Sequence, residues 1–437
     1  MGGGEERMIL LKNASVFTEK RVIEKGLNIA IKDGIIVDLF NNNTVRTELS
    51  NYKVVDCKKL IVAPSFVDLH THLREPGFEY KETVESGAMS AKAGGFTDIC
   101  CMANTSPVAD NEAVIKMIFE KGLKTGINIY PVAAITVGLK GDKLTEFGHL
   151  IDAGALAFSD DGVDVNNSFI MKTAFEYASF FNKPLFCHCE DIVLAENGSM
   201  NEGYFATLAG IRGIPSISEE INVFRNIKIA EYTGSKVHIC HVSTKGSVDI
   251  IRNAKDRGVN VTAETCPHYL TLTDEDVYKS GYNTNFKMNP PLRSEKDRES
   301  LVDALNRDII DCIATDHAPH AEHEKRVEFE YAPFGIIGLE LAFPVCYQLV
   351  KNGKITLEKL IEKFSLEPAR ILGLNKQGIK VGESADLVFI DENKTKVVTI
   401  EDIFSKSKNT PFIGRKLQAW PVMTISKGKI VYSEDVE

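Results

Sequence analysis

Eight short apolar segments recur through the middle of the chain, separated by stretches with helical periodicity. The segments are near-continuous apolar runs rather than alternating ones, which is typical of parallel strands buried on both faces of a sheet. They span residues 60–73, 96–103, 127–136, 155–161, 184–190, 236–243, 259–272 and 311–320.

Amphipathic stretches between and after these segments predict helices that cover the sheet. They span residues 112–124, 170–181, 217–233, 248–257, 296–306 and 357–374. Eight strand–helix units predict an α/β fold of the (β/α)8 barrel type, because eight parallel strands can close on themselves and leave no exposed edge.

The two ends of the chain do not follow this alternation. Both carry short strands separated by turn signals, such as Asp33-Gly34 near the start and Lys427-Gly428 near the end. Two β-rich segments at opposite ends can pair into one small β-sandwich beside the barrel. We therefore expect residues 1–58 and 379–437 to form the composite β-sandwich domain, and residues 59–378 to form the barrel.

Composition narrows the class of protein. The chain has 437 residues and a net charge of -10, which argues against a nucleic-acid partner. Met1–Arg7 lacks the apolar core of an export signal, and the most apolar stretch, residues 127–139, is too short to span a membrane. Nine cysteines are scattered singly, which favours buried thiols over a disulfide framework. A cytoplasmic enzyme with a small-molecule substrate is the expectation.

Histidines and an aspartate mark the ends of four predicted strands. His70 and His72 are two residues apart, so a strand projects both from one face. His188, His241 and Asp316 end the fifth, sixth and eighth strands. These ends meet at one mouth of a barrel, and imidazole and carboxylate are common ligands of zinc. The sequence therefore predicts a metal site at that mouth.

The fourth predicted strand ends in two adjacent aspartates, Asp160 and Asp161. A pair of metal ions needs a bridging ligand, usually a carboxylate or a carbamylated lysine. No lysine lies at this strand end, since the next one is Lys172. An aspartate must therefore bridge if the site is binuclear, and the other one then caps the turn before Gly162. Strand alternation alone does not choose between the two.

The strand-end motifs resemble those of the dihydroorotase family. Residues 68–77 (DLHTHLREPG) look like its first motif, and residues 314–320 (ATDHAPH) with Lys325 look like its second. Residues 334–340 (FGIIGLE) look like the loop that follows. The resemblance covers essentially the whole chain and is closest to the class I dihydroorotases of the amidohydrolase superfamily. One departure is Thr71, where the family usually carries an aliphatic residue.

The resemblance implies a set of roles. His70 and His72 would bind one zinc ion and His188 and His241 the other, with two ions expected per chain and one as the alternative. Asp161 would bridge, and Asp316 would be the remaining ligand and the proton-transferring residue. The implied substrate contacts are His72, Arg74, Asn104, Asn289, His320, Phe334 and Gly335.

The implied reaction is the reversible cyclisation of N-carbamoyl-L-aspartate to (S)-dihydroorotate in de novo pyrimidine biosynthesis. The residue chemistry agrees with it. A zinc ion activates water and polarises a carbonyl, and Asp316 can move a proton to the leaving nitrogen. Arg74 offers a planar fork of donors that matches the carboxylate of dihydroorotate.

Two other readings remain. Allantoinases and hydantoinases or dihydropyrimidinases resemble this chain in fold, but they typically bridge their metals with a carbamylated lysine and lack an arginine at the position of Arg74. A non-catalytic scaffold that docks a pyrimidine enzyme would have lost metal ligands, and none is missing here. The sequence leaves the oligomeric state and docking to aspartate transcarbamoylase open.

Overall fold

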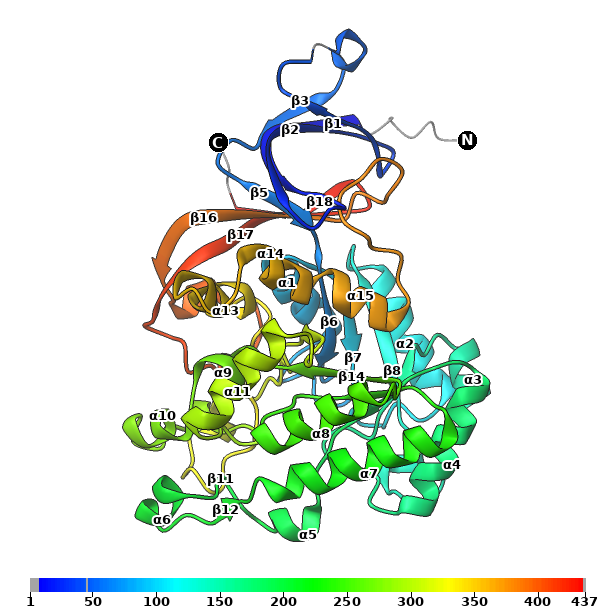
Figure 1. The fold of residues 1–437 in the computed structure, drawn as a ribbon, viewed down its shortest axis with the longest axis vertical. Helices are drawn as coiled ribbons and strands as arrows, with labels where there is room; N and C mark the ends of the chain where they lie inside the picture. Colours follow the sequence, from blue (N-terminus) through cyan, green and yellow to red (C-terminus); the bar gives the residue numbers. More distant parts are fainter. Residues whose placement is uncertain (1–7, 45, 435–437) are drawn as a thin grey trace.

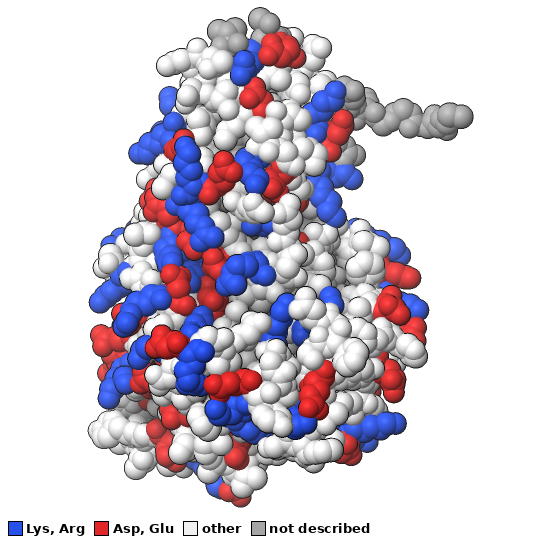
Figure 2. Space-filling model, turned by 45° about the vertical axis from the view of Figure 1, so that its right-hand side comes forward, with Lys and Arg blue, Asp and Glu red and all other residues white. Residues whose placement is uncertain are grey.

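The computed structural model describes residues 8–44 and 46–434, so Met1–Arg7 lies outside the described residues. The chain-end strands occupy one end of the molecule, and the barrel with its helices occupies the other (Figure 1). Within the described ranges, no helix combines the length and apolarity that crossing a membrane requires. On the face seen in Figure 2, basic and acidic side chains are interspersed.

The barrel is built from eight parallel strands in the order β15-β14-β13-β10-β9-β8-β7-β6. A backbone bridge between Thr71 and His317 links the first strand to the segment beyond the last, and His72 N–H donates to the His317 carbonyl at 2.9 Å. The predicted (β/α)8 barrel is confirmed. Its strands are β6 (Phe66–Thr71), β7 (Phe96–Cys101), β8 (Asn128–Ala133), β9 (Ala157–Phe158), β10 (Leu185–Cys187), β13 (Val237–Ile239), β14 (Val261–Thr265) and β15 (Cys312–Ile313).

Ten helices follow or flank these strands. Several begin at polar N-caps whose side chains accept backbone N–H groups, such as Asn111, Asn167 and Ser294. They are α1 (Val84–Ala93), α2 (Glu112–Leu123), α3 (Phe147–Asp152), α4 (Ser168–Phe180), α7 (Ile217–Thr233), α8 (Lys245–Asp256), α11 (Glu295–Asn306), α13 (Ala342–Lys351), α14 (Leu357–Phe364) and α15 (Leu366–Leu372).

Shorter elements lie in the connections. They are α5 (Ile192–Ala195), β11 (Met200–Asn201), α6 (Tyr204–Ala209), β12 (Gly213–Ile214), α9 (Pro267–Thr271), α10 (Asp274–Lys279), α12 (Glu322–Lys325), and the 3-10 turns η1 (Thr47–Leu49), η2 (Val137–Leu139), η3 (Thr284–Phe286) and η4 (Ile400–Asp402). All nine cysteines are described, and each is free and buried.

Several predicted strands are shorter than expected, such as 155–161, 236–243 and 311–320, which are strands only at β9, β13 and β15. Three further predicted elements are divided or end early. The strand expected over 60–73 is divided at Ser65, and its first part pairs outside the barrel. The strand expected over 259–272 ends at Thr265, because Pro267 starts helix α9, where its missing N–H costs nothing. The helix expected over 357–374 divides at Ser365, since Pro368 cannot donate a hydrogen bond to the preceding turn.

Strands from both chain ends share one sheet, in the order β18-β17-β16-β5-β1-β2-β3, with β4 also paired to β1. Its apolar side chains, including Leu11, Ile29, Phe389 and Ile425, form a core separate from that of the barrel. The composite β-domain is therefore confirmed, while the exact divisions after residues 58 and 378 stay a prediction. The strands are β1 (Met8–Phe17), β2 (Ile23–Lys32), β3 (Ile35–Asn41), β4 (Lys53–Asp56), β5 (Ile61–Pro64), β16 (Leu387–Val397), β17 (Lys416–Ser426) and β18 (Lys429–Ser433).

Candidate active site

The predicted metal ligands meet at the carboxyl-terminal ends of five barrel strands. His70 is the last residue but one of β6 and His72 follows the strand, while Asp161 lies beyond β9. The remaining three come after β10, β13 and β15. The structure thus brings together the six residues that the sequence indicated, and all of them are buried: His70, His72, Asp161, His188, His241 and Asp316.

Asp161 lies at the centre of the cluster. Its Oδ1 is 3.3 Å from Nε2 of both His70 and His241. The same oxygen is 3.5 Å from His188 Nδ1, and Oδ2 is 3.4 Å from His72 Nε2. One carboxylate therefore faces a ring nitrogen of each of four histidines, which is the position that a bridging ligand requires.

Asp316 forms a second carboxylate beside two of these rings. Its Oδ1 is 3.0 Å from His72 Nε2 and 3.6 Å from His70 Nε2. Burial raises the pKa of Asp316, but the charge of His70 and the hydrogen bond from His72 outweigh it, so the pKa lies below its usual value. Asp161 behaves in the same way, with His70, His188 and His241 lowering its pKa against burial. Both carboxyls are held ionised by positive charge.

The ring protons of two histidines are directed away from the cluster. His72 Nδ1 donates to Asn104 Oδ1 at 2.9 Å, since an amide oxygen can only accept. His70 Nδ1 lies 2.9 Å from Glu264 and donates to its carboxylate. When these rings are neutral, the lone pair on each Nε2 faces carboxylate oxygens, an arrangement that is repulsive unless a cation, either a proton or a metal ion, lies between them.

This donor set fits a divalent metal ion. His70 Nε2 and His188 Nε2 are buried and have no hydrogen-bond partner within the described part of the chain. Buried polar atoms are normally paired, so such atoms call for an explanation. Two groups of three, His70–His72–Asp316 and His70–Asp161–His241, have ligand atoms within 4.8 Å of one another. Imidazole and carboxylate together suit zinc.

The neighbouring Asp160 has a structural role. Its Oδ1 accepts the backbone N–H groups of Ile135, at 2.7 Å, and Thr136, at 3.0 Å, and Oδ2 accepts the Thr136 hydroxyl. Burial raises the pKa of Asp160 to about 6 despite these bonds. Asp160 therefore braces the loop after β8, and its acceptor positions are already occupied.

Glu264, on β14, is a residue that the sequence analysis missed. Its Oε1 accepts from His70 Nδ1, and its Oε2 accepts from His238 Nε2 at 3.1 Å. Burial opposes ionisation, but the bonds from His238 and His70 lower the pKa of Glu264 to about 2. A fully buried carboxylate that receives a ligand's N–H fixes the tautomer and orientation of that ligand. The sequence feature that could have identified Glu264 is a charged residue within an otherwise uncharged barrel strand.

Asp68, on β6, is a second buried carboxylate that supports the cluster. It accepts the N–H of His70 at 3.0 Å, and the N–H and hydroxyl of Thr315 at 3.1 and 2.6 Å. This joins β6 to the segment after β15 just before Asp316. Asp316 has a φ of 46° and His241 a φ of 34°, in the left-handed region that non-glycine residues rarely adopt. Such strain persists at functional sites where the surroundings enforce it.

A cavity of about 320 Å³ opens above the cluster. Every substrate contact implied by the resemblance lines it: His72, Arg74, Asn104, Asn289, His320, Phe334 and Gly335. Arg74 is anchored by one donor, since its Nε donates to the Pro319 carbonyl at 3.1 Å. Asn289 donates to Glu190 at 3.3 Å, while its buried Oδ1 has no partner among the described residues. Donors and an acceptor therefore remain available to a polar ligand.

His320 is held neutral in the wall of this cavity. Its Nε2 donates to the Phe334 carbonyl at 2.8 Å, and its Nδ1 accepts from Lys81 at 3.3 Å. Burial, followed by the charges of Arg74 and Lys81, lowers the pKa of His320 to about 2. His320 therefore adds no positive charge to the cavity wall, and both of its ring nitrogens are already hydrogen-bonded.

Asn409 reaches the cavity wall from the chain's last segment, which the sequence analysis assigned to the β-domain. It accepts the N–H of His320 at 3.0 Å and donates to the carbonyls of Ala318, at 2.9 Å, and Gly335, at 3.0 Å. One buried amide thus ties the loop after β15 to the loop that carries Phe334 and Gly335. No sequence signal marked this residue.

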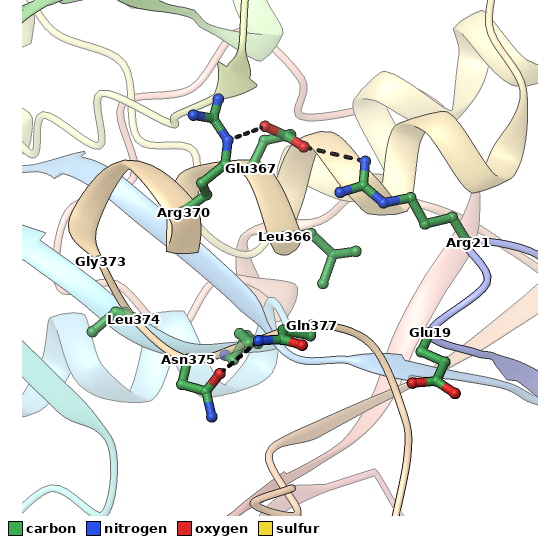
Figure 3. A pocket seen from close by; sticks show the side chains of 10 residues that line it. Glu19, Arg21, Leu366, Glu367, Arg370, Gly373, Leu374, Asn375 and Gln377 are labelled. Carbon is green, nitrogen blue, oxygen red and sulfur yellow. Dashed lines mark hydrogen bonds and ion pairs between the residues drawn. The ribbon is translucent and has the colours of Figure 1, made fainter.

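A wider cleft, of about 600 Å³, shares no lining residue with this cavity and lies between the α15 segment and Glu19 and Arg21, which follow β1. Two of its arginines are paired within it: Arg21 and Arg370 both bond to Glu367, as Figure 3 shows. No metal-ligand cluster is found there among the described residues. Volume alone does not identify a reactive site, and the cluster of imidazoles and carboxylates lies beneath the smaller cavity.

Comparisons with known proteins agree with the chemistry of this site. The family model described as Dihydro-orotase-like matches residues 58–247. A dihydroorotase of Acetivibrio thermocellus is 47% identical over 98% of this chain and 100% of its own length. One of Ruminiclostridium cellulolyticum is also 47% identical, over 98% and 99%. Among solved structures, an L-hydantoinase from Arthrobacter aurescens superimposes with a TM-score of 0.85 at 24% identity, over 97% of this chain and 96% of its own.

The central position of Asp161 yields a test with a neighbour as its control. Asp161→Ala should lose at least one bound metal ion per chain, because every histidine of the cluster faces this carboxylate. Asp160→Ala should keep its metal, since the Asp160 side chain bonds to the loop after β8 and, among the described residues, to no histidine of the cluster. Metal analysis of both purified variants checks this, and the reverse pattern would give the bridging role to Asp160.

The contact of Glu264 with His70 yields a second test. Glu264→Gln should weaken zinc binding by about 10–100-fold, the usual cost of losing a carboxylate that orients a ligand. Thr262→Val serves as the control. The Thr262 hydroxyl contacts His238, which in turn contacts Glu264, so within the described residues it has no direct contact with His70. Competition with a chelator measures both affinities. An unchanged affinity in Glu264→Gln would show that Glu264 does not orient His70.

Proposed function

The chain belongs to the dihydroorotase family, and from that premise we propose that it interconverts N-carbamoyl-L-aspartate and (S)-dihydroorotate with the help of zinc. It is a hydrolase of cyclic amides on an amidohydrolase barrel. The observation that carries the proposal is the cluster centred on Asp161 beneath a cavity that holds Arg74. We also propose that the enzyme is of class I and serves pyrimidine biosynthesis in the cytoplasm.

We assign His70 and His72 to one zinc ion and His188 and His241 to a second, with Asp161 shared and Asp316 as the remaining ligand. Asp161 faces all four imidazole rings, which supports this assignment. When bound, zinc polarises the amide carbonyl and makes water acidic enough to attack near neutral pH. A single occupied position is the alternative.

Asp316 is the proposed proton carrier. Its pKa lies below the usual value, so it enters the reaction as a carboxylate and can accept a proton. In hydrolysis it takes that proton from the attacking water and passes it to the ring nitrogen that leaves. In synthesis the same group moves the proton in the opposite direction. Asp161 is not free for this role because it faces four imidazoles.

Arg74 is the proposed receptor of the substrate carboxylate. Its Nε donates to the Pro319 carbonyl and its Nη2 lies 3.4 Å from His320 Nε2, which leaves Nη1 and the second N–H of Nη2 for the ligand. Lys81 and Lys325 lie beside His320 and add positive charge near that end of the cavity. Asn289 Oδ1, which is buried and unpaired within the described residues, can accept a ring N–H. Asn104, His320 and the backbone of Phe334 and Gly335 would complete the contacts.

The rival readings fit less well. Hydantoinase structures share this fold at 24% identity or less, which bears on fold alone. A neutral ring substrate gives Arg74 no carboxylate to bind, and an aspartate stands where a bridging lysine is expected. A scaffold without activity has no need of four converging imidazoles. Homo-oligomerisation and docking to aspartate transcarbamoylase stay proposals.

The direct test is turnover. The purified protein should hydrolyse dihydroorotate and cyclise carbamoyl aspartate, and it should leave hydantoin and allantoin essentially untouched. Prolonged treatment with a strong chelator should abolish both activities, and added zinc should restore them. Turnover of hydantoin in preference to dihydroorotate would refute the substrate, and full activity in protein shown to be metal-free would refute the metal.

The carboxylate contact has its own test. Arg74→Lys keeps the positive charge but loses the planar fork, so kcat/KM for dihydroorotate should fall by roughly 10²-fold or more. Metal content should be unchanged, because Arg74 is not among the proposed ligands. Arg326→Lys, at an exposed arginine paired with Glu322, is the matched control. Normal kinetics in Arg74→Lys would mean that another group binds the carboxylate.

A further inference from the structure

The connection between β16 and β17 is bonded to loops at the mouth of the barrel. The N–H groups of Phe404 and Ser405 donate to the carboxylate of Glu340 at 3.0 and 2.8 Å, and the Ser405 hydroxyl donates to Glu82. Both carboxylates are buried. Glu82 precedes α1 and Glu340 precedes α13, so two barrel loops anchor this connection. We call residues 404–409 the C-terminal connection.

Asn409 ends the C-terminal connection with an amide whose donors and acceptor are all occupied. Its oxygen accepts the N–H of His320 at 3.0 Å, and its nitrogen donates to the carbonyls of Ala318, at 2.9 Å, and Gly335, at 3.0 Å. The residue is 3% exposed. Among side chains of this size, only an amide supplies two N–H groups and an acceptor together. The bonds of Asn409 therefore depend on its chemical identity.

The two loops that Asn409 joins approach each other closely at Gly335. Its φ is 153°, and a Cβ there would lie 2.5 Å from the Ala318 carbonyl oxygen and 2.7 Å from Cδ2 of His320. Its N–H donates to the carbonyl of Lys287 at 2.9 Å. Because the space between the loops is this small, a shift of either loop would move the His320 ring.

His320 is held at three polar atoms, and each of them leads back to the C-terminal connection. Its N–H is bound by Asn409. Its Nδ1 accepts from Lys81 at 3.3 Å, and the carbonyl of Lys81 accepts the Ser407 hydroxyl at 2.7 Å. Its Nε2 donates to the carbonyl of Phe334 at 2.8 Å, in the loop that Asn409 also binds. The placement of His320 therefore depends on residues far away in the sequence.

We propose that Asn409 is a positioning residue for the carboxylate end of the substrate and acts through His320 and the backbone of Gly335. His320 Nε2 lies 3.4 Å from Nη2 of Arg74, so the ring sets the space in which that guanidinium meets a carboxylate. This inference rests on the proposed function. It adds that the connection between two strands of the β-domain takes part in substrate binding.

The test separates substrate affinity from turnover. Asn409→Ala should raise KM for dihydroorotate by roughly 10-fold or more, since a displacement of about 1 Å at a binding group can cost on the order of 10²-fold. A loss of binding alone leaves kcat within about three-fold of the wild type. Metal content should be unchanged, because Asn409 is not among the proposed ligands. Asn393→Ala, at an exposed asparagine of β16, is the matched control and should keep the wild-type KM.

A double variant tests whether Asn409 acts through His320. Residues that act through one another give losses that do not multiply, so Asn409→Ala/His320→Ala should lose at least about five-fold less in kcat/KM than the product of the two single losses. A variant that is merely less stable would instead contain less active enzyme. Its apparent kcat would fall at an unchanged KM, and its loss would multiply with that of His320→Ala.

Two results in an active enzyme would overturn this inference alone: an unchanged KM in Asn409→Ala, or losses that multiply in the double variant. If Asn409→Ala does not fold, Ser407→Ala decides. It loses one bond to the carbonyl of Lys81 and should raise KM by about three-fold or more, and an unchanged KM would overturn the inference. A wild type that does not turn over dihydroorotate would overturn the proposed function and this inference with it.

Discussion

The burial of the Asp161 carboxylate among four imidazoles is the interaction on which the barrel mouth depends. A buried charge without compensation costs on the order of 3–5 kcal/mol, so strands β6, β9, β10 and β13 must bring their ends to one point. Asp68 and Glu264 hold that arrangement from below by fixing the backbone and the ring of His70. The ligands are thus supported by carboxylates deeper in the barrel, and the barrel interior is partly polar for that reason.

Much of the fold could be predicted because it rests on local pattern. The apolar runs located all eight barrel strands, and the chemistry at their ends identified five of the residues that the structure brings together. The sixth, Asp161, was distinguished from Asp160 only by the resemblance to the family. The errors came from single residues that interrupt a run. Pro267 starts a helix where the pattern continued as a strand, and Ser65 separates two strands that belong to different sheets.

The supporting residues could not be predicted, because their partners are distant in sequence. Asn409 bonds to residues 74 and 91 positions away, and Glu264 lies 194 positions from His70. Strand alternation also could not show which of Asp160 and Asp161 faces the histidines. It depends on the loop at Ile135 and Thr136, whose N–H groups bind one carboxylate and leave the other to the histidines.

The sharing of one sheet by both chain ends has a consequence for biosynthesis. Strand β5 pairs with β16, and Asn409 joins the two loops that wall the cavity, so neither contact can form until the last part of the chain has been made. At about 5–20 residues per second, the wait between the emergence of β5 and that of β16 is on the order of 20–60 s. During this time the edge of β5 is unpaired and able to join another chain. A nascent chain on the ribosome is therefore inactive, and it is most open to aggregation just before release.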